Sequence, residues 1–439
     1  MSRFKKADDP DQALLLPRSP RDWLPEGHLA WFVMETVDQL NIDGFLDFYR
    51  QCGKGELPYP PKVMLALLIY AYATGVKSSR RIAAQIEDSL AFRVLARGLE
   101  PSHRTICRFR EDHLDEFINL FAQVAQIAAE AGMVKLGLVA VDGTKIKANA
   151  SKHKAMSYDR MLTEEKRLRE EIEKLTQAAK NQDEIDDKAF GPDFRGDELP
   201  AELSRRETRL KTILKAKQSL TDRKTAEAEA TRAAEAAAKG KPPEPPSGEP
   251  VVPEPRNQEN FTDPDSRIMP TGGKSFDQCY NAQVAVDAEN QIIVSASVVQ
   301  APNDNGQILP VLNGVFECMG KVAASVVADA GYKNERDLAQ LAAMNVDAFI
   351  ATGREGKNAS SAKAKGPHTS AMNEKLATES GRQTYAKRKW IVEPAFGWIK
   401  HVLGFRAFSM RGLRKVEAEW NLVCAALNLR RMAVIARAM

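Results

Sequence analysis

The apolar pattern changes at Leu136, and this change limits the possible folds of the chain more than any other feature. The run Leu-Gly-Leu-Val-Ala-Val-Asp that begins there is too short for a helix and is flanked by turn residues, so it predicts a buried strand ending at Asp142. Further strand patterns occupy 280–286, 291–299, 323–328 and, more weakly, 347–352. Helical patterns occupy 308–318 and 335–344. The C-terminal half is therefore predicted to be an α/β domain.

Residues 21–132 instead show the apolar spacing of short helices. The pair Pro60-Pro61 is placed to open one helix and Gly132 to close the last. A helix ending near Ser89, a turn at 98–102 and a basic helix beyond it fit a DNA-binding helix-turn-helix. A basic helical bundle that touches no DNA fits equally well. The basic residues concerned are Lys77, Arg80, Arg81, Arg93, Arg97, Arg104, Arg108 and Arg110.

A segment of different character separates the first strand from the others. Met161, Leu168, Leu203 and Leu210 fall at heptad-like positions among charged residues, which predicts two helices in an antiparallel hairpin joined through 191–200. The Pro-rich stretch that follows predicts an extended linker. The predicted division is a tail at 1–20, a helical domain at 21–132, the α/β domain at 133–150 and 275–439, a coiled-coil insertion at 151–240 and a Pro-rich linker at 241–274.

Composition narrows the class of protein. The 439 residues are 43% hydrophobic and 28% charged, and no apolar run approaches the roughly 20 residues of a membrane span, so none is expected. The polar N-terminus lacks a signal-peptide core, and a cytoplasmic location is expected. The net charge is only +4, yet the segment from Arg382 onward holds twelve Lys or Arg against three Glu. That segment suggests a polyanionic partner, although a solvated basic helix has the same pattern.

Asp142 and Asp329 each follow an apolar run and precede a Gly-containing turn. A carboxylate at the end of a buried strand is costly unless donors or cations compensate it. Two such acids suggest strand ends that converge on one polar site. Ordinary turn chemistry explains either residue taken alone.

Glu393 lies in a basic segment with helical spacing, in which Val392 and Phe396 belong to an apolar stripe. Lys400 follows Glu393 by seven residues, two helical turns, so the two side chains face the same region. Pro394 is disfavoured inside a helix and should place Glu393 near a helix start or at a kink. A surface ion pair is the ordinary alternative for such a Glu.

The three acids have a joint chemical rationale. Mg²⁺, like Mn²⁺, takes oxygen ligands in octahedral geometry and is bound by one or two carboxylates. Asp142, Asp329 and Glu393 can therefore hold two ions. Two ions about 3.5–4 Å apart activate a water or a 3′-hydroxyl and stabilise the leaving oxygen of a phosphodiester displacement. The neighbouring Lys and Arg would position phosphates.

The motifs around these acids, taken in order, resemble those of the DDE-type transposases of bacterial insertion sequences over nearly the whole chain. They are Asp142-Gly-Thr-Lys-Ile with Ala148-Asn-Ala-Ser-Lys-His153, Phe261 to Met269, Tyr280 to Asp287, Asp329-Ala-Gly-Tyr332, and Val392-Glu-Pro-Ala-Phe-Gly with Gly404-Phe-Arg-Ala-Phe and Arg411-Gly-Leu.

The resemblance implies a ribonuclease H-like mixed sheet flanked by helices, with an all-α N-terminal domain. It implies that Asp142, Asp329 and Glu393 are the catalytic, metal-binding acids. It also implies an enzyme that cuts double-stranded DNA at the terminal inverted repeats of its element and joins the freed 3′-hydroxyl to target DNA. A homodimer on DNA is expected because transposition brings two ends together, and its place is the bacterial cytoplasm, at the nucleoid when bound.

Such enzymes carry a Tyr-x2-Arg-x3-Glu-x6-Lys signature around the last acid. Tyr385, Arg388 and Lys400 fit it, but four residues separate Arg388 from Glu393, and Lys389 stands at the three-residue spacing. The phosphate-binding base is left open between Arg388 and Lys389. The predicted DNA-contacting set is Tyr385, Arg388, Lys389, Lys400, Arg406 and Arg411.

Two other functions fit the same residues. A nuclease or resolvase of this fold would hydrolyse DNA without joining ends, and a DNA-binding descendant of a transposase would do no chemistry. Relatives often carry their insertion just before the helix of the last acid, whereas here it follows the first acidic strand, so its role is not carried over.

Overall fold

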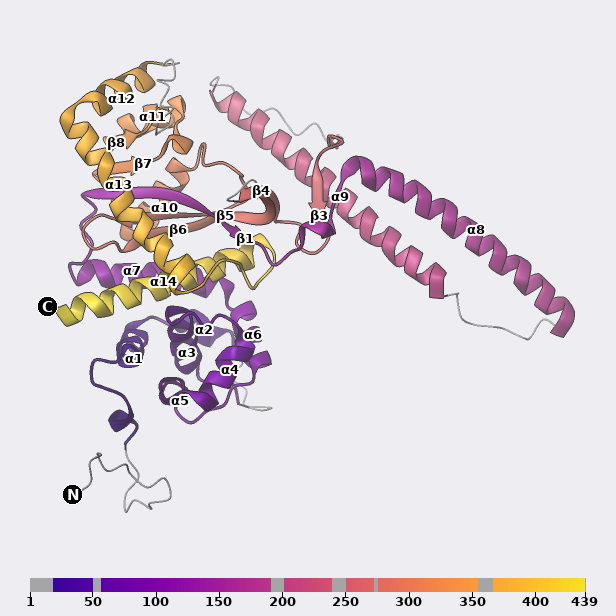
Figure 1. The fold of residues 1–439 in the computed structure, drawn as a ribbon, viewed down its shortest axis with the longest axis horizontal. Coiled ribbons are helices and arrows are strands. Elements are labelled where there is room, and N and C mark those ends of the chain that lie inside the picture. Colours follow the sequence, from indigo (N-terminus) through magenta and orange to yellow (C-terminus); the bar gives the residue numbers. More distant parts are fainter. Residues whose placement is uncertain are drawn as a thin grey trace, which may run out of the picture.

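The computed structural model describes residues 19–49, 57–190, 201–238, 250–271, 275–353 and 366–438. Figure 1 shows three parts, which are a group of short helices, a sheet with helices packed on it, and a long helical hairpin that projects from one side. The C-terminal helix α14 (Leu413–Ala438) runs between the short helices and the sheet.

A six-stranded mixed sheet forms the centre of the molecule. Its strands are β1 (Leu138–Lys147), β4 (Arg267–Thr271), β5 (Ser275–Asp287), β6 (Ile293–Val299), β7 (Ser325–Ala328) and β8 (Asp347–Ile350). The order is β4-β5-β1-β7-β8, with β6 paired to β5. β1 is antiparallel to β5 and parallel to β7, which is parallel to β8. The predicted α/β architecture with a mixed sheet flanked by helices is confirmed.

Alternation along β1 separates two apolar layers. Val139 and Val141 are buried with α10 (Ile308–Met319) and α11 (Glu335–Ala343). Ala140 and Ile146 belong to the cluster that contains residues of α13 (Glu379–Gly397) and α14. Because successive strand residues point to opposite faces, Asp142 shares the face of Ala140 and lies toward α13.

The remaining helices include η1 (Pro20–Trp23), α1 (Leu29–Gln39), α2 (Asp43–Asp47), α3 (Pro61–Ala73), α4 (Ser79–Asp88), α5 (Leu90–Ala96), α6 (His103–Asp112), α7 (Leu114–Glu130), η2 (Lys152–Lys154), η3 (Ala330–Tyr332) and α12 (Pro367–Ala377). The starts of α3 and α6 lie at the predicted signals, and the Ser102 hydroxyl accepts a hydrogen bond from the Thr105 amide at the cap of α6.

The N-terminal helices and the sheet share one apolar cluster, and α14 joins them. At their junction Glu419 of α14 is buried and accepts hydrogen bonds from the Tyr72 hydroxyl at 2.8 Å and from the Ser409 amide at 2.8 Å. Arg110 donates to the same Tyr72 hydroxyl at 2.7 Å, and its Nη1 lies 4.0 Å from Glu419. This buried network ties α3 and α6 to α14.

The predicted antiparallel hairpin is formed by α8 (Tyr158–Phe190) and α9 (Ala201–Ala238). Ion pairs from Arg206 to Glu171 at 2.8 Å and from Lys217 to Glu165 at 2.9 Å join the two helices in antiparallel register. The predicted connection at 191–200 and the Pro-rich residues 241–249 lie outside the described residues. At the base of the hairpin β2 (Ala155–Ser157) pairs with β3 (Gln258–Asn260).

The structure corrects three sequence predictions. β1 does not end at Asp142 but continues to Lys147, because Gly143 to Lys147 pair with β5. The segment after the prolines is not only a linker, since it contributes β3 and β4. A helix, α5, lies between the predicted first helix and turn of the helix-turn-helix.

We expect Glu419→Ala to lower the free energy of unfolding by about 3–5 kcal/mol, because Arg110 would be left as a buried charge without its acid. Glu111→Ala is the matched control, since it removes an exposed pair with Lys415 at 3.2 Å and should cost less than about 1 kcal/mol. Chemical denaturation measures both, and equal losses would contradict the role assigned to the network.

Candidate active site

The parallel register of β1 and β7 places two acids side by side. Val141 is opposite Ala328, so Asp142, within β1, lies beside Asp329, the first residue after β7. Such strands lie about 4.8 Å apart. The Asp142 carboxylate accepts a hydrogen bond from the Gly143 amide, and that of Asp329 accepts one from the Gly331 amide, each at 2.8 Å. The two acids therefore lie side by side as predicted, although Asp142 lies within β1 and not at its end.

Burial and neighbouring charge disfavour ionisation of Asp142. Burial, followed by the charge of Asp329, raises the pKa of Asp142 to about 7. The Gly143 amide and the Arg388 guanidinium lower this pKa, and Asp304 adds to the rise. In the protein without a cation the carboxylate is thus held at an energetic cost, which a bound cation would remove.

Helix α13 crosses above these strands and brings two cations to them. Arg388 is buried, and its Nη1 lies 3.4 Å from Asp142 Oδ2. Lys400 donates a hydrogen bond to the hydroxyl of Thr144, two residues beyond Asp142 on β1. Lys400 lies in η4 (Trp398–Val402), a π-helical turn that continues α13, and burial lowers its pKa.

Glu393 lies on the same helix between Arg388 and Lys400, but its side chain is exposed. It makes no hydrogen bond or ion pair with any residue that the structure describes. Of the two positions predicted for Glu393, the one near a helix start is wrong, because α13 begins at Glu379 and Pro394 lies within it. The alternative, a kink, fits the irregular π-helical turn that follows α13. Pro394 has no amide hydrogen to donate to the Trp390 carbonyl one turn earlier. That carbonyl instead accepts a hydrogen bond from Gln291 Nε2 at 2.9 Å.

The other predicted DNA-contacting residues surround this helix. The Tyr385 ring lies 5.9 Å from the Arg388 guanidinium carbon, and Lys389 is exposed. Arg406 is exposed and donates to the Lys400 carbonyl at 3.0 Å, and exposed Arg411 donates to the Asn149 carbonyl at 2.9 Å. Of the two alternatives, Arg388 therefore faces the acids.

Sequence reasoning missed a further acid, Asp304, in the turn after β6. Its carboxylate accepts hydrogen bonds from Asn281 Nδ2 and Gln283 Nε2, each at 2.7 Å, and lies 3.8 Å from Lys145 Nζ. A side chain at Gly143 would lie 2.6 Å from Asp304 Oδ1, so the carboxylate packs directly on the backbone next to Asp142. The polar turn Pro-Asn-Asp-Asn-Gly gave no signal beyond turn chemistry.

The donors at this site suit a hard divalent cation. Asp142 and Asp329 offer carboxylate oxygens, and Mg²⁺ usually takes one or two carboxylates together with waters and substrate phosphates. Within the described ranges no group of three or more His, Cys, Asp or Glu is arranged to hold a metal ion by itself. Glu393 could act as a third protein ligand only if its exposed side chain turned inward.

Comparison with known families decides the class. Residues 254–429 match the family described as Transposase DDE domain, and residues 18–112 match the one described as Transposase domain (DUF772). The chain belongs to the DDE-type transposases of insertion sequences. Asp329 and Glu393 lie inside the first match, and Asp142 lies between the two. No curated protein and no solved structure matches the chain. Among the described residues, this transposase has no helix long and apolar enough to cross a membrane.

The raised pKa of Asp142 gives a stability prediction for the metal-free transposase. In the unfolded chain Asp142 loses its proton near the ordinary pKa of 3.8, whereas in the folded protein it keeps the proton up to a pKa of about 7. The contribution of Asp142 to the stability of the fold is therefore lost as pH rises from about 4 toward 7. We expect Asp142→Asn to stabilise the fold at pH 8 by about 1–3 kcal/mol, and by less at pH 5. Thermal unfolding at both pH values tests this. A stabilisation independent of pH would contradict it.

Arg388 and Lys389 form a matched pair of adjacent cations. We expect Arg388→Ala to slow DNA cleavage by this transposase about 10- to 100-fold, because it removes a buried charged contact to Asp142. Lys389→Ala should stay within about twofold, since its side chain is exposed. Single-turnover cleavage rates on transposon-end DNA compare them, and a larger loss for Lys389→Ala would reverse the assignment.

Proposed function

We propose that this transposase cuts DNA at the ends of its insertion sequence and transfers the freed 3′-hydroxyl to target DNA, with Asp142, Asp329 and Glu393 as its three acids. The observation that carries the proposal is the adjacent placement of Asp142 and Asp329 on parallel strands, with Asp142 held at a raised pKa. A buried carboxylate beside a second acid is unfavourable for folding alone, and a perturbed acid such as Asp142 is typical of functional sites.

Asp142 and Asp329 would hold one of two Mg²⁺ ions between them, and Glu393 would help to hold the second. Bound divalent ions activate the attacking water or 3′-hydroxyl and stabilise the leaving oxygen. Arg388 keeps the Asp142 carboxylate oriented toward α13, and Lys400 is anchored at Thr144 beside it. Both cations stand where the phosphates of a bound strand would pass.

The exposed position of Glu393 fits a ligand completed on DNA binding. Its side chain lies on the helix that already contacts Asp142 through Arg388, five residues earlier. In solvent it avoids the repulsion that already acts between Asp142 and Asp329. Inward rotation would accompany the arrival of cations and phosphates, which reverse the charge balance of the site.

The N-terminal helices offer a surface for binding the element's ends. α4 and α6 pack on each other in the order proposed for the helix-turn-helix. Arg110, in contrast, is buried against Tyr72 and Glu419 and serves the fold. The basic residues available to DNA on these helices and the adjoining α5 are Arg80, Arg81, Arg93, Arg104 and Arg108. Pairing of two ends by a homodimer completes the proposal.

The test uses a DNA fragment bearing the inverted repeats found in the genomic DNA that flanks the gene. With Mg²⁺, wild type should nick the ends and join them to a plasmid target. Asp142→Ala, Asp329→Ala and Glu393→Ala should each reduce both steps by at least about 100-fold, a loss of roughly 3 kcal/mol in transition-state stabilisation. Glu379→Ala, an exposed acid on the same helix, is the control.

Each outcome bears on a different part of the proposal. Undiminished cutting by one of the three variants removes that residue from the site. Cutting without joining by wild type favours a nuclease or resolvase. DNA binding without any cutting favours a descendant that has lost catalysis.

A further inference from the structure

Beside β4 and β5 lies a pocket of about 550 Å³, apart from the three acids. We propose that this pocket binds a backbone phosphate of the DNA whose scissile bond lies at the acids. The proposal rests on the proposed function for the identity of the DNA. It goes further by assigning a second site of contact with the DNA backbone, and by giving the base of the insertion a role in DNA binding.

The walls of the pocket come from the insertion and the core together. α9 supplies Arg223, Lys224 and Glu227, and the core supplies residues of β4 and β5 with the segment 300–302. Apolar lining is limited to Ile268, Ala301 and Pro302. A lining so rich in charged and amide side chains does not suit an apolar ligand, because sites for apolar ligands are lined mainly by apolar side chains.

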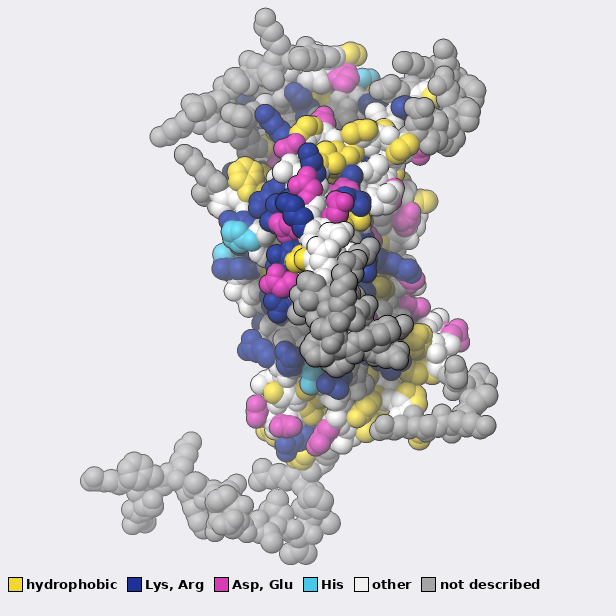
Figure 2. All heavy atoms as spheres, turned by 90° about the vertical axis from the view of Figure 1, so that its right-hand side faces the viewer, with side chains coloured by type: hydrophobic (Ala, Val, Ile, Leu, Met, Phe, Trp, Pro, Cys, Tyr) yellow, Lys and Arg dark blue, Asp and Glu magenta, His cyan; other side chains and the backbone are white. Residues whose placement is uncertain are grey.

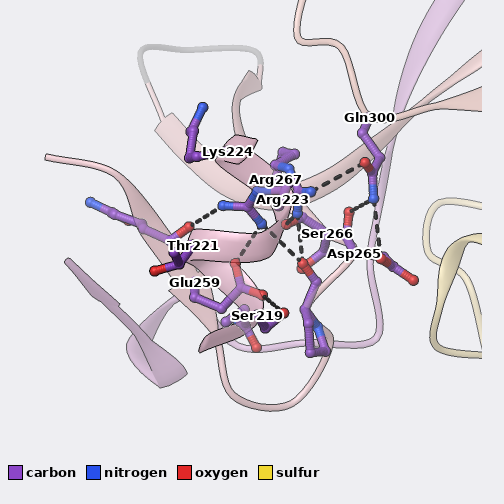
Figure 3. A network of polar contacts seen from close by, with 12 residues as sticks. Ser219, Thr221, Arg223, Lys224, Glu259, Asp265, Ser266, Arg267 and Gln300 are labelled. Atoms are coloured by element: carbon purple, nitrogen blue, oxygen red, sulfur yellow. Dashed lines mark hydrogen bonds and ion pairs between the residues drawn. The ribbon is translucent and has the colours of Figure 1, made fainter. Parts of the chain in front are cut away.

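Two of the four cations of the pocket are already neutralised by acids. Arg223 forms an ion pair with buried Glu259, whose other oxygen accepts a hydrogen bond from Ser219 at 2.9 Å. Lys224 lies 2.6 Å from Glu227. Figure 3 shows the Arg223–Glu259 contact, which fixes α9 against β3. These pairs explain how the pocket holds its shape without a ligand.

The other two cations form no ion pair within 4 Å among the described residues, although the charges of Glu259, Asp265 and Glu227 act on Arg267 from farther away. Arg267 donates only to neutral oxygens, which are the Pro264 carbonyl at 2.6 Å, the Ser266 carbonyl at 2.8 Å and Gln300 Oε1 at 3.1 Å, as Figure 3 shows in part. Burial, and next the charge of Arg223, lower the pKa of Arg267. Arg256 is exposed and makes no hydrogen bond or ion pair within the described ranges. An anion in the pocket would compensate both charges.

The pocket is close enough to the acids to hold the same DNA. Gln300 lines it, and Asp304, which lies against Gly143 next to Asp142, follows four residues later. Four residues span at most about 14 Å. B-DNA advances about 3.4 Å per nucleotide along its axis, so Gln300 lies within about four nucleotide steps of Asp304, and one duplex can reach both the pocket and the acids. Figure 2, which views the molecule from the side of the insertion, shows Lys and Arg gathered on this face among acidic side chains.

The experiment measures binding of the full-length chain to a fluorescein-labelled 30-base-pair duplex in EDTA over a series of KCl concentrations. Arg256→Glu is the main variant, because Arg256 has no contact on which the fold depends. Lys211→Glu is the matched control, an exposed cation on α9 about 20 Å from Lys224 along the helix. Arg267→Gln, checked by thermal unfolding, tests the buried guanidinium.

We expect Arg256→Glu to weaken binding roughly tenfold at low salt and to reduce the slope of log K against log [KCl] by about one. Lys211→Glu should stay within about twofold. If Arg256→Glu and Lys211→Glu weakened binding equally, or if Arg256→Glu had no effect, the proposed phosphate site in the pocket would be overturned. Wild type that binds no duplex would instead overturn the proposed function.

Calorimetric titration with sodium phosphate separates DNA from a free anion. The proposal expects weak binding that duplex DNA displaces. Tight phosphate binding that Arg256→Glu abolishes, with duplex affinity unchanged, would identify a small-anion site and overturn the proposal.

Discussion

The parallel pairing of β1 with β7 is the constraint on which the rest of the site depends. It places Asp142 and Asp329 on adjacent strands, and the turns after β6 and β7 bring Asp304 and Gly331 to the same place. The pairing is maintained by apolar residues on both faces of the sheet, since Val139 and Val141 pack on one side and Ala140 on the other. A shift of one residue would turn Asp142 to the opposite face, toward α10.

The acids of the site lower the stability of the folded protein, and contacts in the surrounding structure offset part of this loss. A buried carboxylate next to a second one destabilises the folded state, and Arg388 offsets only part of this. Pro394 removes a helical hydrogen bond two turns before Lys400, and Gln291 takes up the freed carbonyl. Unfavourable charge burial thus accompanies the acids, whereas the buried charges of Glu419 and Arg110 compensate each other where the N-terminal helices meet α14.

Sequence patterns predicted the elements whose signal is local. The core strands, the hairpin and the starts of several helices follow from apolar spacing and cap residues, and Asp142 and Asp329 follow from their place after apolar runs. Contacts between distant segments were not predictable. β1 extends past Asp142 because β5 pairs with it, Asp304 looked like a turn residue, and β4 lies in a segment that composition assigned to a linker. The choice between Arg388 and Lys389 depended on how α13 is rotated, and spacing alone left it open.

The central claim is that these acids bind the divalent cations of a DNA-cutting site. Anomalous diffraction from crystals of the Asp329→Asn and wild-type proteins, each with duplex DNA and Mn²⁺, tests it most directly. The account predicts manganese bound between Asp142 and Asp329 in wild type, with Glu393 turned inward toward a second ion beside it. In the variant, the density between the two positions should be weaker or absent. Manganese bound only elsewhere would contradict the account. So would manganese density at this site that is equally strong in the wild-type and Asp329→Asn crystals.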